Sequence, residues 1–315
     1  MAVLAVTGLW AFSVEEKTAE MQDRADYKIV NIGGAEVSVP RRPQRVVVLT
    51  AASMETWVAA GGGAQIIARP KASMSPASVH ARVNKDASDL GLPGNVSIEN
   101  IIRQNPDLVV GSAMLSTQNM IVQPLNATNI PFLAFPNFSI EEICQEIALC
   151  GELTGNEELA QQEIKRIKDN IEKEAKRRRD SAPKKRVLLI WGTPVSFSMA
   201  LPNSRQGDVL RLAGGENIAV NPGTDARFIP FSLEYAVQAD PDYVLFMTHG
   251  NREKVQAQME KTLAESSAWR EIRAVREGRA IVLPPELFAV NPGPRIDEAV
   301  VFLSRLIYPD SEMKK

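Results

Sequence analysis

The sequence predicts an α/β protein with two doubly wound α/β lobes joined by one long rigid α-helix. Three observations predict this fold class. Residues 98–110 return 135 positions later, as residues 233–245, with the same pattern of apolar and polar side chains. Apolar strands alternate with amphipathic helices in both halves of the chain, and one long helical pattern separates the halves.

Each copy of the repeat has a glutamate, Glu99 or Glu234, near the start of a short amphipathic helix. The helix pattern stops at a Pro-Asp pair, and a β-branched apolar strand follows directly. A single unit of this kind is a common α/β connection. Two units with glutamates at equivalent positions predict two matched lobes.

Composition limits the classes of function. The 315 residues include 36 Lys and Arg against 38 Asp and Glu, so the chain has no overall basic field for nucleic acid. Cys144 and Cys150 fall in one helical pattern, about 9 Å apart along its axis, which is too far for a disulfide. The spacing of His and Cys fits no structural zinc site, and we expect no intrinsic cofactor.

The first 26 residues are expected to lie outside the lobes. Residues 1–14 are apolar but too short to cross a bilayer. They match the apolar region of a secretory signal with a cleavage site at Ala11-Phe12-Ser13, although no basic residue precedes them. A buried N-terminal strand or helix is the alternative. With residues 15–26 as a charged spacer, the segment predicts an exported protein, periplasmic or associated with the cell surface.

The N-terminal lobe is expected at residues 27–153. Two short strand patterns around Gly33-Gly34 predict a β-hairpin, and the apolar run from Arg45 to Thr50 predicts a strand buried on both faces. The further strands are expected at residues 65–68, 108–111 and 131–135, and the helices at residues 52–60, 98–104, 120–126 and 140–153.

The connecting helix is expected within residues 154–183, from Glu157 to about Arg179. Thr154 and Glu157 have the spacing of a capping box, and apolar residues recur every three or four positions after them. Glu174 and Arg178 are spaced as a helix-stabilising pair. The basic residues at the end of the helix fit a solvated C-terminus better than a nucleic-acid site. At about 35 Å, such a helix would be a stiff connection.

The C-terminal lobe is expected at residues 184–310. It contains the second copy of the repeat. The other strands are expected at residues 186–192 and 279–283, and the other helices at residues 207–212, 251–264, 269–275 and 295–308.

Five sequence blocks carry a family resemblance. In chain order they are PQRVVVLT, IENIIRQNPDLVV, QGDVLRLAGGENIA, SLEYAVQADPDYVLF and LFAVNPGPR. Over residues 41–308 they resemble the substrate-binding proteins of ABC importers for iron complexes, haem and cobalamin. The resemblance implies a monomeric receptor without catalytic activity. It also implies a ligand cleft between two lobes that move little, because the connecting helix is rigid.

The resemblance also gives the repeated glutamates a role. In cobalamin-type relatives, one surface glutamate per lobe docks into arginine pockets of the membrane permease, and these glutamates correspond to Glu99 and Glu234. A carboxylate near a helix start is favoured by the helix dipole in any case, so a simple terminal charge is the alternative. Two equivalent copies meeting a two-fold symmetric permease favour docking.

The residues after the two repeated strands are expected to face the ligand, because open parallel sheets bind ligands beyond the carboxyl ends of their strands. Met114 and His249 occupy equivalent positions there, and His with Met is a sensible axial pair for haem iron. Similarity to haem-binding lipoproteins of surface haem uptake systems supports His249, whose Thr-His-Gly segment matches their Ala-His-Gly. Their methionine corresponds to Gly94 here. Met114 or Met74 would therefore have to replace it, or the ligand is not haem; a structural methionine is the alternative for Met114.

Three further residues, Trp191, Arg227 and Phe288, are candidate walls of the ligand site. Aromatic rings offer a flat apolar wall to a macrocycle, and an arginine can pair with the carboxylates of haem or with an anionic siderophore. Core packing or ordinary surface is the alternative for each.

The predicted function is an extracytoplasmic solute-binding protein that delivers haem or a ferric siderophore to an ABC permease. A cobalamin receptor of the same family is an alternative. A tetrapyrrole metal chelatase is the competing enzyme class, but the nearest acidic residue to His249 is Glu253, one helical turn away. A sensor that binds its ligand without transport is the third class.

Overall fold

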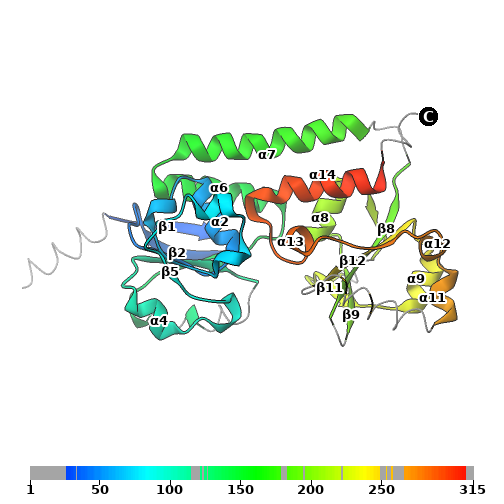
Figure 1. The fold of residues 1–315 in the computed structure, drawn as a ribbon, viewed down its shortest axis with the longest axis horizontal. Helices are drawn as coiled ribbons and strands as arrows, with labels where there is room; N and C mark the ends of the chain where they lie inside the picture. Colours follow the sequence, from blue (N-terminus) through cyan, green and yellow to red (C-terminus); the bar gives the residue numbers. More distant parts are fainter. Residues whose placement is uncertain are drawn as a thin grey trace, which may run out of the picture. The chain divides into compact units, whose positions relative to one another are not determined.

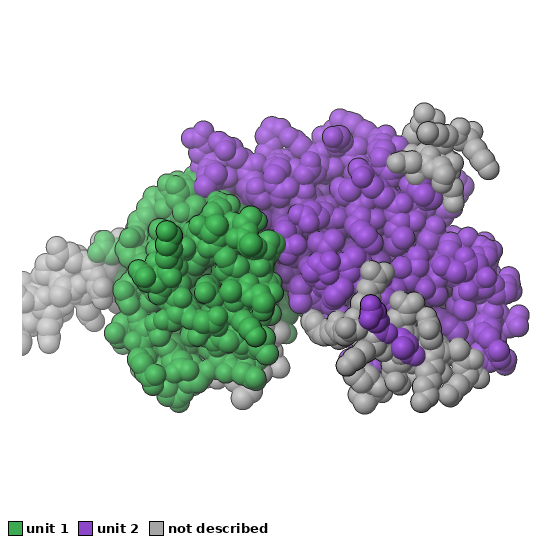
Figure 2. Space-filling view, viewed as in Figure 1, with its two compact units in different colours: residues 1–136, 149–157 green, residues 137–148, 158–315 purple. Residues whose placement is uncertain are grey.

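The computed structural model describes residues 26–32, 34–114, 121–122, 124–125, 127–178, 183–193, 196–220, 223–248, 253, 257 and 266–309. The chain divides into two compact units (Figure 2). Unit 1 comprises residues 1–136 and 149–157, and unit 2 comprises residues 137–148 and 158–315. Each unit has a β-sheet of its own with helices packed on it, so the predicted α/β class is confirmed. The predicted signal-like segment and its cleavage site lie outside the described residues.

Unit 1 is built on a parallel sheet with the strand order β5-β4-β3-β6-β7 and a separate antiparallel hairpin, β1-β2 (Figure 1). Its strands are β1 (Tyr27–Ile32), β2 (Ala35–Pro40), β3 (Val46–Val48), β4 (Ile66–Arg69), β5 (Ser88–Asp89), β6 (Leu108–Ser112) and β7 (Phe132–Phe135). Its α-helices are α2 (Ala51–Ala59), α3 (Ala77–His80) and α4 (Ile98–Arg103), and its 3-10 helices are η1 (Gly63–Gln65), η2 (Ala72–Met74) and η3 (Pro93–Asn95).

The central strands of unit 1 follow from their composition. All three residues of β3 are fully buried, as expected for a strand covered on both faces. At the hairpin, Gly34 has φ 81°, a conformation that glycine adopts without steric cost. The predicted hairpin and central strand are confirmed, although β3 ends earlier than predicted because Thr50 already caps α2.

Unit 2 has a mixed sheet with the order β11-β9-β8-β12-β13, and β10 pairs with β8. Its strands are β8 (Arg186–Gly192), β9 (Phe197–Ala200), β10 (Glu216–Asn217), β11 (Phe228–Pro230), β12 (Tyr243–Thr248) and β13 (Ala280–Val282). Its helices are α7 (Glu157–Arg178), whose first residue lies in unit 1, α8 (Arg205–Leu212), α9 (Leu233–Ala239), α11 (Ser267–Glu271), α12 (Arg273–Arg276), α13 (Pro285–Phe288), η4 (Gly293–Arg295) and α14 (Ile296–Ile307).

Three features of unit 2 differ from the prediction. The antiparallel strands β9 and β11 were not predicted. The single helix expected at residues 269–275 is two helices, α11 and α12, because Ile272 between them is extended at φ −62° and ψ 127°. Helix α6 (Ile140–Thr154) is shared, because residues 140–148 belong to unit 2 and residues 149–154 to unit 1. The helices predicted at residues 120–126 and 251–264 lie largely outside the described residues.

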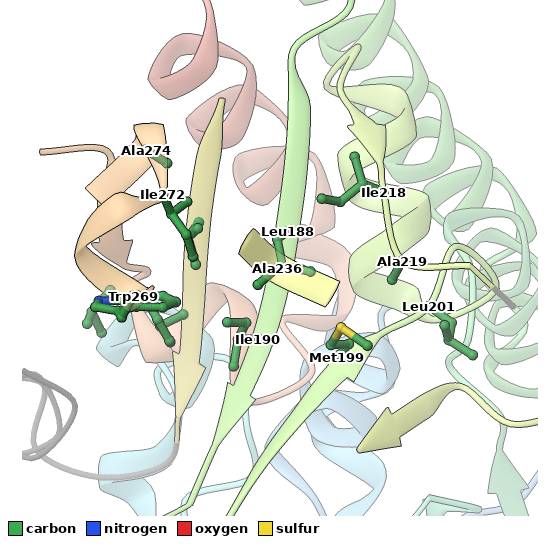
Figure 3. Close-up of a cluster of buried hydrophobic side chains, with 13 residues drawn as sticks. Leu188, Ile190, Met199, Leu201, Ile218, Ala219, Ala236, Trp269, Ile272 and Ala274 are labelled. Carbon is green, nitrogen blue, oxygen red and sulfur yellow. The ribbon is translucent and has the colours of Figure 1, made fainter. Parts of the chain in front are cut away.

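The main core of unit 2 lies on one face of its sheet (Figure 3). Leu188 and Ile190 alternate along β8 and point to this face, where they pack with Ala236 of α9 and Trp269 of α11. Met199 on β9 extends the same face. Trp191 follows Ile190 on β8 and therefore points to the opposite face of the sheet.

The sequence repeat is also a structural repeat. The two copies correspond to α4 with β6 and to α9 with β12. After each helix comes a residue in the left-handed region, Asn105 (φ 49°) after α4 and Asp240 (φ 38°) after α9. Asparagine and aspartate tolerate this conformation better than other non-glycine residues. The Pro-Asp pair follows at once, so the chain turns directly from each helix into its strand.

The aspartates of the two Pro-Asp pairs accept hydrogen bonds from equivalent backbone positions. Asp107 accepts hydrogen bonds from the backbone N–H groups of Gln44 (2.7 Å) and Arg45 (3.0 Å), just before β3. Asp242 accepts one from the backbone N–H of Arg186 (2.8 Å), at the start of β8. Each aspartate thus fixes the start of the strand beside its own, which explains why the repeat contains Pro-Asp twice.

The long helix α7 is attached along its length to α14. Asp297 of α14 is buried and accepts hydrogen bonds from Arg166 Nη1 (2.8 Å) and Asn170 Nδ2 (2.7 Å). Near the C-terminal end of α7, the buried Glu174 pairs with Arg177 (2.6 Å) and with Arg305 of α14 (3.5 Å). The helix therefore belongs structurally to unit 2 rather than standing alone.

Two local predictions for this helix are wrong. Thr154 is the last residue of α6 rather than a cap of α7, and its hydroxyl donates to the Ala60 carbonyl at 2.6 Å. Glu174 does not pair with Arg178, because its carboxylate points to α14. Arg178 instead donates to the Leu212 carbonyl (3.1 Å), so this part of the basic cluster is structural.

Candidate functional site

The carboxyl edge of the unit 1 sheet contains a buried hydroxyl pair. Thr50 follows β3 and caps helix α2, and its Oγ1 lies 2.7 Å from Ser53 Oγ. Ser53 Oγ in turn donates to the Gly111 carbonyl on β6 (3.2 Å). These bonds tie the start of α2 to the neighbouring strand. The edge is therefore a fixed surface and not a loose loop.

Met114 lies beyond the carboxyl end of β6. It follows β6, its backbone N–H donates to Ser112 Oγ (3.2 Å), and 41% of the residue is exposed. An exposed thioether at the carboxyl end of a buried strand can contact a ligand. Met74, the other candidate, ends η2 and is half-buried. At Gly94 an added side chain would meet no atom within 4 Å, so this position is open space.

His249 follows Thr248, the last residue of β12, and lies outside the described residues. Thr248 itself is buried at the carboxyl end of the strand. Strand β12 pairs with β8 up to the last residue of each, Thr248 opposite Gly192. Trp191, opposite Met247, therefore lies near the carboxyl end of both strands. The prediction for His249 stays a prediction.

Trp191 and Phe228 form an aromatic pair at the edge of unit 2. Their ring centroids lie 6.0 Å apart with an interplanar angle of 70°. Strand β9 runs between β8 and β11, and it pairs Ser198 with Trp191 and Ala200 with Phe228. Small residues on β9 leave room for the two large rings to meet above them. Both rings are half-buried, so part of this apolar pair is open to solvent.

Arg227 lies directly before Phe228 and is held from two sides. Its Cζ lies 3.4 Å from the centroid of the Phe138 ring, and its Nη1 donates to the Asn203 carbonyl (2.7 Å). Among the residues that the structure describes, no carboxylate lies within ion-pair distance of Arg227. A half-buried arginine without an acidic partner is a candidate receptor for an anionic group.

Phe288 lies elsewhere. It is 2% exposed, and its ring packs on Phe302 of α14 at 5.8 Å. Its carbonyl accepts a hydrogen bond from Gln206 Nε2 of α8 (3.1 Å). These contacts place Phe288 in the packing of α8, α13 and α14. Trp191 and Phe228 are therefore in contact, Arg227 is the neighbour of Phe228 in sequence, and Phe288 is not part of that group.

Phe138 is a residue that the sequence did not single out. It has no periodic neighbour and lies between β7 and α6, so the sequence shows a lone aromatic residue after Pro136. Only the tertiary contact with Arg227 reveals its place in the candidate site.

The two glutamates of the repeat are exposed at equivalent positions. Ser97 caps α4 and Ser232 caps α9, each through its side-chain oxygen. Glu99 and Glu234 lie in the first turns of these helices. A hydrogen bond from the Ser97 hydroxyl (2.6 Å) and the residue's own N–H lower the pKa of the Glu99 carboxyl, so it is ionised at neutral pH.

Unit 2 also contains a buried ionisable pair, Glu146 of α6 and Arg205 of α8. Burial raises the pKa of the Glu146 carboxyl well above its usual range, and burial lowers the pKa of Arg205 to about 10. Glu146 Oε1 accepts the backbone N–H of Asn137 (3.1 Å), and Arg205 Nη2 donates to the Val290 carbonyl (3.3 Å). Glu146 thus holds the segment before α6, and Arg205 holds the segment after α13.

The described residues contain no group of three or more His, Cys, Asp or Glu side chains that could hold a metal ion. In the same part of the chain, no helix combines the length and apolar character needed to span a bilayer.

Comparison with known proteins identifies the family. The sequence model of the periplasmic binding protein family matches residues 46–287, which is most of the chain. The chain belongs to the periplasmic binding protein family. Its members are binding proteins. Three of the five blocks noted in the sequence lie within the matched region, PQRVVVLT lies partly within it, and LFAVNPGPR begins at its last residue.

Among members of the periplasmic binding protein family, the chain is similar to the high-affinity heme uptake system protein IsdE of Staphylococcus aureus (strain MRSA252). The two are 24% identical over 232 residues, which cover 72% of this chain and 77% of the relative. The fold is similar to S. aureus IsdE complexed with heme, with a TM-score of 0.72, 21% identity, and coverage of 84% and 98%. It is also similar to the catecholate-siderophore binding protein VctP of Vibrio cholerae, with a TM-score of 0.69, 17% identity, and coverage of 89% and 99%.

Proposed function

We propose that this protein captures an iron complex outside the cytoplasm and delivers it to an ABC permease. Haem is the first ligand we propose, a ferric siderophore the second and a corrinoid the third. Membership of the periplasmic binding protein family supports a binding function over a chelatase. The names of similar proteins, a heme uptake protein and a catecholate-siderophore binding protein, support the ligand class.

One observation carries the choice of ligand. Unit 2 presents a partly exposed aromatic pair, Trp191 and Phe228. The residue before Phe228 is Arg227, a cation without a carboxylate partner among the described residues. Aromatic rings and a cation in one unit suit an anionic complex such as haem, whose ring is apolar and whose edge has two carboxylates. His249 would bind the iron beyond the carboxyl end of β12, and Met114 is the second iron ligand that we propose.

Docking on the permease would use Glu99 and Glu234. Their exposure, their equivalent places on α4 and α9, and the serine caps beside them support this role. We further propose lobes at residues 27–153 and 184–310, a stiff connection at residues 154–183, and a ligand cleft between the lobes. The protein would work as an exported monomer.

The test is a binding titration with three probes: haemin, a ferric catecholate siderophore and cyanocobalamin. Haemin is expected to bind most tightly. Trp191→Ala should weaken it by about 5- to 30-fold, since an aromatic contact with its buried area contributes roughly 1–2 kcal/mol. Trp191→Phe retains an aromatic ring and should stay close to the parent protein. Failure of all three probes to bind would refute the proposed function, and equal affinity of Trp191→Ala and the parent would remove Trp191 from the site.

A further inference from the structure

Residues 137–140 lead into helix α6 and are held unusually firmly in unit 2. Asn137 is buried, with φ 57°. Its backbone N–H donates to Glu146 Oε1 (3.1 Å), and its side-chain Oδ1 accepts from Asn291 Nδ2 (2.5 Å). A buried asparagine in the left-handed region persists only when its surroundings fix it. Here a carboxyl group and an amide do so from two sides.

The next residues of this segment are fixed by two more acidic side chains. The backbone N–H of Phe138 donates to Glu142 Oε2 (2.6 Å), and that of Ile140 donates to Asp208 Oδ2 of α8 (2.9 Å). The free N–H groups at the start of a helix need such partners, and carboxylates are the strongest ones available. Three carboxyl side chains therefore set the backbone on both sides of the Phe138 ring.

The Phe138 ring in turn orients Arg227. With Cζ 3.4 Å from the ring centroid, the guanidinium lies against the aromatic face, and Nη1 is bonded to the Asn203 carbonyl at 2.7 Å. A guanidinium has five N–H donors in a fixed planar fork. A ring against its face and a carbonyl at one donor fix the plane of the fork. The other donors are then aimed before any ligand arrives.

We propose that Phe138 is a positioning residue that presets Arg227 to receive a carboxylate of the ligand, so that the protein selects anionic complexes over neutral ones of the same shape. This inference rests on the proposed function and adds that the protein selects its ligand by a carboxylate group. Arg227 directly precedes Phe228, one member of the aromatic pair, so both features belong to the same part of unit 2. A ligand with a flat apolar body and a carboxylate edge matches both.

The test compares haemin with haemin dimethyl ester, which has the same ring but no free carboxylate. The full chain is expected to bind haemin about 10- to 100-fold more tightly than the ester, the range for a hydrogen bond to a charged group. Arg227→Gln should abolish this preference. Phe138→Leu should reduce it to within a few-fold by weakening haemin more than the ester. Phe138→Tyr, which restores an aromatic face, should rescue it.

A matched control separates positioning from general charge. Arg270→Gln removes one exposed positive charge from α11 of the same unit and should leave the preference intact. Equal binding of haemin and its ester by the parent protein, or an unchanged preference in Phe138→Leu, would overturn the inference while leaving haem capture in place.

Absence of binding to both porphyrins would instead refute haem as the ligand. The same variants would then be compared with ferric citrate, which is anionic, and a neutral ferric trihydroxamate. A preference for the anionic complex that falls in Phe138→Leu would support the inference. No preference, or no binding to either complex, would overturn it.

Discussion

Replacing Asp297 with alanine is expected to lower the free energy of unfolding by about 2–4 kcal/mol. Asp297 is 2% exposed and accepts hydrogen bonds from Arg166 and Asn170 of the long helix α7. Its loss leaves Asn170 without this acceptor and Arg166 without a buried anion. The cost is less than for a fully buried pair, because the Arg166 side chain is 41% exposed and keeps Glu163 at 2.8 Å.

The control for this substitution lies on the same helix. Asp169 pairs with Lys165, but both side chains are largely exposed. Asp169→Ala should therefore change stability by no more than about 0.5 kcal/mol. Urea unfolding of the two variants, followed by tryptophan fluorescence, measures the difference. Equal stability of the two variants would mean that the contact between α7 and α14 is not an important attachment of the long helix.

Reversing both repeated glutamates, Glu99→Lys with Glu234→Lys, is expected to abolish ligand-dependent stimulation of the permease ATPase. Each lost charge pair in a docked interface would cost roughly 2–5 kcal/mol, and the reversal adds repulsion from arginines. Ligand affinity should stay unchanged, because neither glutamate belongs to the proposed ligand contacts. Each single reversal should have an intermediate effect, since the two sites are equivalent.

The matched control is Glu36→Lys with Glu216→Lys. These residues are exposed, one in each unit, and lie outside the repeat on β2 and β10. The control protein has the same net charge as the docking variant, so it tests whether charge alone is responsible. Equal stimulation by the docking variant and the parent protein, or equal loss in the control, would contradict docking through Glu99 and Glu234.

Much of the fold could be predicted because a helix or strand is indicated by the spacing of apolar residues within the segment itself. The repeat shows an amphipathic helix, a Pro-Asp stop and an apolar strand in order, and the structure has these elements as α4-β6 and α9-β12. The long helix α7 was equally clear from its apolar spacing. An Arg-Val pair stands at the start of both strands that Asp107 and Asp242 hold, because Arg45 directly precedes β3 and Arg186 begins β8.

The parts that were missed depend on contacts between distant segments. Strand β9 is short, Phe-Ser-Met-Ala, and its alternation is too brief to separate it from a loop. The Phe138–Arg227 contact joins residues 89 positions apart, which no local pattern contains. Phe288 follows a strand as a site residue would, but its ring turns to Phe302 of α14. The sequence shows that Phe288 follows a strand, but the direction of its ring depends on packing against other segments.

The central claim is that this protein binds an iron tetrapyrrole through the carboxyl edge of unit 2. The most direct measurement is the absorption spectrum of the purified protein with added haemin, recorded beside the variants His249→Ala and His80→Ala. These are the two histidines of the chain, and His80 lies on α3 of unit 1. We predict a shifted Soret band that is lost in His249→Ala and kept in His80→Ala. An unshifted band in the parent protein, or a shifted band retained in His249→Ala, would contradict the account.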